Sequence, residues 1–212
     1  MTYLISTLIF AVVGTAQLNI FEIEGIFSNA HINALEGHIE EYEYTDDDLL
    51  ILQYSSQEGS AESIAELNSL LSGYDFPIGV WFGPYKISID FKQLNNFDYI
   101  GFSPGLEINN VSFDESVEKK YCTVNICNFK DRKIIVSSNE GIYDNYLIVG
   151  TLGSFIENID FVISDQSIEF FKPSLFERFY IAISNPIFTY MFFVLGFALI
   201  GLELFAIGPG LM

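Results

Sequence analysis

The chain has 212 residues, 28 of them acidic and 9 basic, which gives a net charge of −19. So acidic a chain is repelled by phosphate backbones and by anionic lipid headgroups, and this argues against nucleic-acid binding. Half of the residues are hydrophobic and 21 are Phe, a composition that excludes intrinsic disorder. The length suits one ordinary domain with a substantial core.

The first 16 residues, MTYLISTLIFAVVGTA, form a short apolar segment. Its small residues Gly14 and Ala16 precede a cleavage point after Ala16, so residues 1–16 are typical of a secretory signal peptide. Such a signal would place the acidic domain outside the cytoplasm. The basic start of a signal peptide is missing, because no Lys or Arg precedes Lys86. An uncleaved anchor, or a buried first strand and helix, therefore stays open.

Residues 17–184 carry nearly all of the charge and are predicted to form one domain. Its first element is a strand over Asn19–Glu24, where apolar and polar residues alternate. Ser28 or Asn29 can then cap a helix. The apolar face of this helix repeats at intervals of three and four residues and consists of Ile32, Leu35, Ile39 and Tyr42.

The same helix carries the two histidines of the chain, His31 and His38. They are seven residues apart, so they share a face but are separated by about 10 Å along the axis. That separation is too long for one metal ion without an intervening ligand. We assign both side chains to the helix surface and predict neither a metal site nor a cofactor.

Two further strands and a second helix follow. Leu49–Tyr54 is a continuous apolar run typical of a strand buried on both faces. A helix is predicted over Ala61–Ser72, ending at Gly73, and Pro77 introduces another buried strand over Ile78–Phe82. Strands and helices that alternate at this spacing predict a parallel sheet of the α/β class.

The second half of the domain changes to short strand-like runs separated by Asn, Asp, Gly and Ser. Only Phe113–Lys120 has room for a brief helix. Cys122 and Cys127 lie in a strand-like run; they can alternatively form a small disulfide, but two ligands are too few for a structural metal site. The predicted strands are Asp98–Phe102, Tyr121–Cys127, Lys133–Ser138, Tyr146–Gly150 and Ile159–Ile163.

Residues 185–208 are predicted to form a transmembrane helix, followed by a short tail over 209–212. The run from Ile187 to Ile207 is almost wholly apolar and spans about 31 Å as a helix, close to the ~30 Å hydrocarbon core of a bilayer. Glu203 is four residues from its end, so we expect its carboxylate to reach the headgroup region. The flanks hold too few basic residues to orient the span, and its orientation is inferred from the signal peptide.

Five stretches of the sequence follow one another in an order that matches a known family. They are EIEGIF, LLILQYSSQEG, FPIGVWFGP, FSPGLEI and NPIFTYMFFVLGFALIGLELF. Together they resemble the NfeD family, membrane-bound proteins whose extracytoplasmic domain resembles a ClpP-class serine protease. The resemblance implies an α/β, ClpP/crotonase-like extracytoplasmic domain with a C-terminal transmembrane helix. It also implies self-association into a homo-oligomer and association with band-7 or stomatin-like membrane proteins.

The resemblance implies an oxyanion site after the second strand. In relatives, an Asp-Thr-Pro-Gly-Gly motif lies there, and colinear matching puts Ser55, Ser56, Gln57, Glu58 and Gly59 on it. The second glycine is kept and the first is replaced by Glu58, whose charge opposes an oxyanion. Loss of one oxyanion donor costs about 3 kcal/mol in the transition state.

Relatives also need a serine nucleophile and a lysine base with a depressed pKa. Colinear counting from Pro84 puts the nucleophile position at Phe91, which has no hydroxyl. Ser88 could serve only after a three-residue slip, and the surrounding KISID alternates like an edge strand. Lys130 and Lys133 lie at about the right distance downstream to act as the base, although their polar NFKDRK setting is typical of solvated charge.

We therefore expect a catalytically degenerate ClpP-like domain, with no catalytic residue, anchored in the lipid bilayer and acting in membrane-protein interaction or assembly. The alternative is an active membrane-bound serine protease with Ser88 as nucleophile and Lys130 or Lys133 as base. A third possibility is a membrane-anchored adhesion or ligand-binding ectodomain that is related in structure only. The sequence does not identify the partner or establish whether Met212 is the natural end.

Overall fold

The computed structural model describes residues 17–59, 61–88, 94, 96–109, 133–136, 139–143, 146–161, 168–171, 173–184 and 186–206. Several predictions from the sequence lie outside these residues. They are the signal peptide over residues 1–16, the helix over Phe113–Lys120, the strand that contains Cys122 and Cys127, and Met212.

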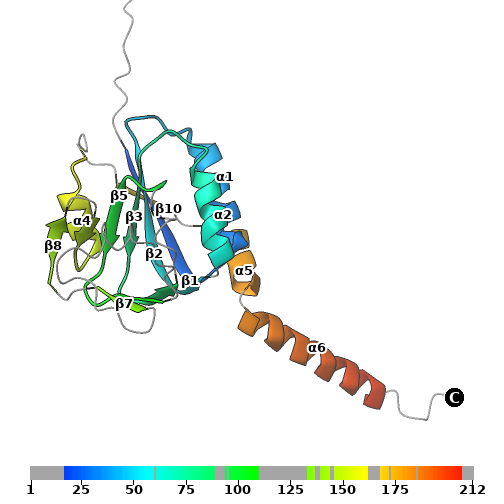
Figure 1. Cartoon of the computed structure of the whole chain (residues 1–212). Coiled ribbons are helices and arrows are strands. Elements are labelled where there is room, and N and C mark those ends of the chain that lie inside the picture. Colours follow the sequence, from blue (N-terminus) through cyan, green and yellow to red (C-terminus); the bar gives the residue numbers. More distant parts are fainter. Residues whose placement is uncertain are drawn as a thin grey trace, which may run out of the picture.

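A seven-stranded sheet forms the centre of the domain (Figure 1). Its strand order is β10-β1-β2-β3-β5-β9-β8, and all neighbours are parallel except β8 and β9. The predicted α/β class with a parallel sheet is confirmed. The strands are β1 (Leu18–Phe27), β2 (Leu49–Gly59), β3 (Ile78–Phe82), β5 (Tyr99–Phe102), β8 (Gly141–Tyr143), β9 (Tyr146–Ile148) and β10 (Ile168–Phe171).

Helices cover both faces of this sheet (Figure 1). α1 (Asn29–Tyr42) and α2 (Ala61–Leu71) lie on one face, and α4 (Leu152–Asn158) lies on the other. β2 shows how the sequence requires this arrangement: Leu50 and Leu52 join the core on the α1 side, while Leu49 and Ile51 join the core on the α4 side. All four side chains are fully buried, as expected for a strand between two helical layers.

The elements of the first half agree closely with the prediction. β3 has the predicted bounds, α2 begins at the predicted residue, and Ser28 is the N-cap of α1. At the end of α2, the N–H of Gly73 donates to the carbonyl of Leu70, which closes the last turn. Local turn and cap residues therefore set these boundaries.

A three-stranded sheet packs beside the main one. It consists of β4 (Lys86–Ser88), β6 (Glu107–Asn109) and β7 (Lys133–Ile135), in the order β4-β6-β7. The prediction that the segment around Ser88 is an edge strand is confirmed. Ile87, Ile108 and Val136 from this region join the core on the α1 side.

The predicted strand over Ile159–Ile163 is wrong at the residues that the structure describes. Ile159 is the C-cap of α4, and its N–H donates to the carbonyl of Phe155. The helix begins because the hydroxyl of Thr151 accepts from the N–H of Ser154, an N-cap that the sequence analysis overlooked. Phe155 is fully buried against the sheet and holds α4 in place.

The chain ends in three elements that the sequence analysis only partly predicted. β10 pairs with β1 and leads into α5 (Leu175–Ser184), which packs against α1. α6 (Pro186–Ala206) then projects away from the domain (Figure 1). It contains an 18-residue window, Ile187–Leu204, that is long and apolar enough to cross a membrane, and no residue of that window is buried.

Candidate functional site

The oxyanion site implied by the resemblance falls at the carboxyl end of β2. The prediction that this strand ends at Tyr54 is wrong, because β2 continues as an extended strand to Gly59. β1 runs beside it and pairs Gly25 with Ser56, Ile26 with Glu58 and Phe27 with Gly59. The register skips one residue of β2, which makes a β-bulge at this point. The prolonged β1 explains the strand, since its backbone pairs with the residues of β2 beyond Tyr54.

Ser56 fixes this bulge. Its hydroxyl donates to the carbonyl of Gly25 at 2.5 Å and accepts from the N–H of Phe27 at 3.1 Å, and the side chain is fully buried. Gly25 has a φ of +77°, a conformation that favours glycine. The hydroxyl at the position that aligns with the threonine of the motif thus bonds to the backbone of β1.

Tyr54, two residues earlier, closes the same region with an aromatic side chain. Its ring centroid lies 5.7 Å from that of Phe27 and 5.5 Å from that of Phe82. Burial raises the pKa of Tyr54 to about 12, partly offset by a hydrogen bond with Ser56. The phenol therefore stays protonated at neutral pH and serves packing and hydrogen bonding.

The residues of the alternative serine–lysine pair lie in the small sheet. Asn109 of β6 pairs with Ser88 of β4 on one side and with Lys133 of β7 on the other. Ser88 and Lys133 thus share one row, two strand spacings apart, or about 10 Å between their backbones. Lys130 and the colinear nucleophile position Phe91 lie outside the described residues.

Two polar groups in the small sheet lie close to these residues. The Oδ1 atom of Asn109 is buried and has no hydrogen-bond partner among the described residues. Two residues before Ser88, the Nζ atom of Lys86 makes an ion pair at 3.2 Å with the carboxylate of Glu107. That side chain is largely exposed and held by the ion pair, unlike the buried lysine that the resemblance requires.

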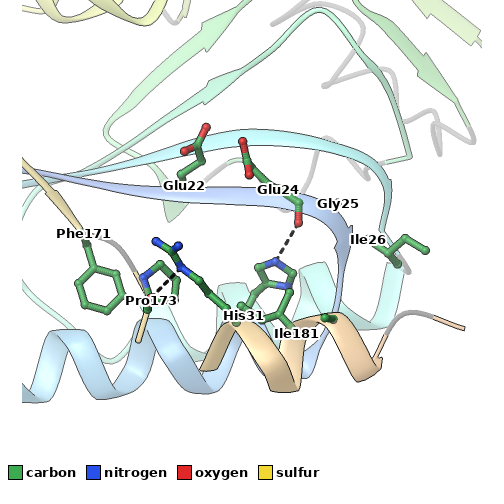
Figure 2. A pocket seen from close by; sticks show the side chains of 10 residues that line it. Glu22, Glu24, Gly25, Ile26, His31, Phe171, Pro173 and Ile181 are labelled. Carbon is green, nitrogen blue, oxygen red and sulfur yellow. Dashed lines mark hydrogen bonds between the residues drawn. The ribbon is translucent and has the colours of Figure 1, made fainter. Parts of the chain in front are cut away.

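A cavity of about 460 Å³ lies elsewhere, between β1, α1 and α5 (Figure 2). Glu22 and Glu24 of β1 border it, but Figure 2 shows their carboxylates on the side of the strand away from His31. Below the strand, the cavity is lined by His31 of α1, by Phe171 of β10 and by residues of α5. The part of the cavity next to His31 therefore does not receive the carboxylates of Glu22 and Glu24.

His31 is buried, with 2% of its surface exposed, so its assignment to the helix surface is wrong. Its Nε2 lies 3.0 Å from the carbonyl of Glu24, and its Nδ1 lies 3.4 Å from the N–H of Ser28 (Figure 2). These partners require a neutral ring that donates through Nε2 and accepts through Nδ1. Burial lowers the pKa of His31, with the hydrogen bond to Glu24 opposing, and the ring is neutral at pH 7.

His38 is half-buried rather than on the surface. Its Nε2 is 3.0 Å from the hydroxyl of Tyr44, and its ring centroid is 4.0 Å from that of Phe171 in β10. Burial lowers the pKa of His38, opposed chiefly by the carboxylate of Glu169. The spacing His31, Leu35, His38 and Tyr42 (four, three, four) is itself a helical face, a signal that could have revealed both contacts.

α5 supplies the part of the cavity that the sequence analysis missed. Ser174 and Glu177 form a reciprocal capping box: the Glu177 carboxylate accepts from the Ser174 N–H at 2.6 Å, and the Ser174 hydroxyl accepts from the Glu177 N–H at 3.3 Å. Arg178 lines the cavity and donates from Nε to the carbonyl of Pro173 at 2.9 Å. The Ser-x-x-Glu pattern was available in the sequence and predicts this helix start.

Comparisons with known proteins identify the fold. No protein-family model matches the sequence, and no curated protein matches it. Two solved structures of the 1510-N membrane-bound stomatin-specific protease do match. A lysine-to-alanine mutant in complex with a substrate peptide gives a TM-score of 0.54 at 9% identity, over 82% of this chain and 100% of that one. A serine-to-alanine mutant gives 0.51 at 9% identity, over 76% and 100%.

At this identity the likeness establishes the fold alone. It confirms the expected ClpP-like α/β class, with the mostly parallel sheet that the strand pairing requires. The C-terminal apolar helix completes the predicted architecture.

Proposed function

We propose that this protein is a catalytically degenerate relative of membrane-bound ClpP-class serine proteases, anchored by α6, whose role is interaction or assembly with other membrane proteins. One observation carries the proposal: the segment Ser55–Gly59 is a β-strand held by Ser56, where catalysis would need a glycine-rich turn. An oxyanion hole needs backbone N–H groups fixed toward the substrate. A segment that pairs with β1 as a strand does not form such a turn.

The sequence at these positions supports the same conclusion. Glu58 replaces the first glycine of the oxyanion motif, and its negative charge would oppose an oxyanion. The colinear nucleophile position, Phe91, has no hydroxyl. A lysine without a serine performs no acyl transfer.

The proposed arrangement is a signal peptide over residues 1–16, an extracytoplasmic domain over 17–184, a transmembrane helix over 185–208 and a short tail over 209–212. An apolar helix that no part of the domain buries supports the anchor. The net charge of −19 also favours an anchor that inserts through apolar side chains over one that binds anionic lipids.

The proposed partner is a band-7 or stomatin-like membrane protein, and the protein is proposed to self-associate. The fold neighbour is described as stomatin-specific, which supports this class of partner. The test is co-purification with a co-expressed stomatin-like protein in mild detergent, with the mass of the complex measured by light scattering. We expect a complex with more than one copy of this chain. Recovery as a free monomer would contradict the assembly role.

A control variant tests whether the domain or α6 recognises the partner in that experiment. In it, α6 is replaced by an unrelated apolar helix of equal length, and the domain is kept. If the domain recognises the partner, the complex survives the exchange. Loss of the complex would assign recognition to the span.

A serine protease remains the second candidate, because the row Ser88, Asn109 and Lys133 favours it. Its test is cleavage of a purified stomatin-like protein by the wild type and by the Ser88→Ala and Lys133→Ala variants. If the protein is a protease, the wild type cleaves the stomatin-like protein and both variants lose this cleavage. Equal and negligible cleavage by all three proteins is expected for the degenerate domain.

A further inference from the structure

α5 turns several of its large apolar side chains away from the domain. Four of them lie on one stripe and are strongly exposed: Leu175 (83%), Phe176 (80%), Phe179 (58%) and Tyr180 (65%). At about 100° per residue they cover an arc of roughly 140° on one side of the helix. Contiguous exposed apolar surface of this kind marks an interaction site.

The opposite side of α5 is the one that meets the domain. There Glu177 accepts the N–H of Ser174 at the helix start, and Ile181 lines the cavity beside α1. A surface helix of a soluble protein has the reverse arrangement, with apolar residues inward and charged residues outward. The outer face of α5 is therefore suited to an apolar surrounding rather than to water.

α5 also adjoins the candidate membrane span directly. It ends at Ser184, α6 begins at Pro186, and the hydroxyl of Thr189 donates to the carbonyl of Ile183 at 2.9 Å across the junction. Figure 1 shows α5 against the lower end of the domain, with α6 continuing from it. If α6 crosses a bilayer, the stripe on α5 lies at the bilayer boundary.

We infer that α5 lies in the interface of the bilayer that α6 crosses, with its Leu175, Phe176, Phe179 and Tyr180 face among the headgroups and upper acyl chains. The inference rests on the proposed membrane anchoring. Helices of this kind bury their apolar face about 5–10 Å into that boundary, and aromatic residues are enriched there. Because the chain is strongly acidic, burial of apolar surface must bind the lipid, and neutral phosphatidylcholine is sufficient.

This placement orients the whole domain. Parallel strands have their carboxyl ends at one edge of a sheet, and β10 enters α5 from that edge. The cavity lined by Arg178 and Ile181 then opens near the membrane surface. The carboxyl edge, where α/β proteins bind their ligands, would face lipid and other membrane proteins rather than bulk solvent.

The test uses tryptophan fluorescence of the full chain in phosphatidylcholine vesicles that carry bromine at defined acyl-chain depths. The chain has one tryptophan, Trp81, which is buried in the domain and sets the unquenched baseline. Phe179→Trp probes the outer face of α5, and Phe193→Trp probes the middle of α6. Asp47→Trp, in the exposed turn before β2 at the opposite edge of the sheet, is the matched control.

We expect the added emission of Phe179→Trp to fall by about half with shallow bromines and less with deep ones, as befits an interfacial depth of about 5–10 Å. Phe193→Trp is quenched most by deep bromines, and Asp47→Trp by neither. No quenching of Phe179→Trp while Phe193→Trp is quenched overturns the inference and leaves the anchor intact. A blue-shifted but unquenched Phe179→Trp likewise overturns it and assigns the face to protein. No quenching of Phe193→Trp overturns the anchoring itself.

Discussion

β2 lies inside the sheet, between β1 and β3, and α5 lies at the carboxyl edge of the sheet; both are rich in apolar residues. In β2, Leu49 to Leu52 are all fully buried between two layers of helices. In α5, Leu175 and Phe176 are more than three-quarters exposed. An apolar run thus stabilises the fold in one region and presents a surface in the other, so composition alone does not distinguish core from interface.

The largest effect we predict contrasts a phenylalanine in each region. Phe21→Ala in β1 removes a fully buried ring that stacks on Phe171 at 5.3 Å, and we expect a loss of about 3–5 kcal/mol in the free energy of unfolding. Phe176→Ala in α5 removes an exposed ring and is expected to change that free energy by less than about 0.5 kcal/mol. Guanidinium unfolding in detergent, followed through Trp81, measures both. Equal losses of unfolding free energy in the two variants would contradict this difference between a buried and an exposed phenylalanine.

A substitution at a glycine in the core is expected to have a smaller effect on the free energy of unfolding. A Cβ atom at Gly101 of β5 would lie 2.5 Å from Phe155 and 2.9 Å from Trp81. We expect Gly101→Ala to lower the free energy of unfolding by about 1–3 kcal/mol through overpacking. Gly37→Ala in α1 is the control, because a Cβ there meets nothing within 4 Å. It is expected to stabilise by up to about 1 kcal/mol, since glycine weakens a helix.

The buried histidine makes stability depend on pH. Because burial lowers the folded-state pKa of His31 below 6.5, the unfolded chain takes up the proton first as the pH falls. His31 therefore lowers stability progressively below pH 6.5, by at most about 1.4 kcal/mol per pH unit. Unfolding of the wild type and of His31→Gln between pH 7.5 and 5.5 measures the difference. Equal slopes for the two proteins would argue against a neutral, buried ring.

The smallest effects concern helix caps. Thr151→Ala removes the N-cap of α4, which holds Phe155 in the core, and should lower the free energy of unfolding by about 1 kcal/mol. Ser174→Ala removes the corresponding cap of α5. We expect it to speed hydrogen exchange within α5 alone, because that helix contributes little to the core. A global loss with Ser174→Ala would mean that α5 belongs to the folded core.

The two regions also differ in how well the sequence predicts them. Caps, turns and apolar periodicity are local, and they predicted β3, the start of α2 and the N-cap of α1 correctly. The strand Ile168–Phe171 was missed because its identity depends on pairing with β1, about 150 residues earlier in the chain. His31 was placed on the surface because its partner, the carbonyl of Glu24, lies in the preceding strand, in a contact that no local pattern reveals.

At the candidate site too, contacts between distant segments were not predicted from the sequence. Colinear matching identified Glu58 and Phe91 as departures from the catalytic pattern. It did not reveal that Ser55–Gly59 continue the strand, which they do because β1 extends far enough to pair with them. The alignment of Ser88 with Lys133 arises from the order β4-β6-β7, in which β7 is antiparallel to β6, and sequence spacing does not reveal it.

Labelling with a serine-reactive phosphonate tests the proposed loss of catalysis most directly. The full chain is anchored in vesicles and treated beside its Ser88→Ala and Lys133→Ala variants, and bound probe is located by mass spectrometry. A degenerate domain gives no specific labelling of the wild type and no difference among the three proteins. Labelling of Ser88 that disappears in Ser88→Ala and weakens in Lys133→Ala would contradict the degenerate reading and establish an active serine–lysine protease.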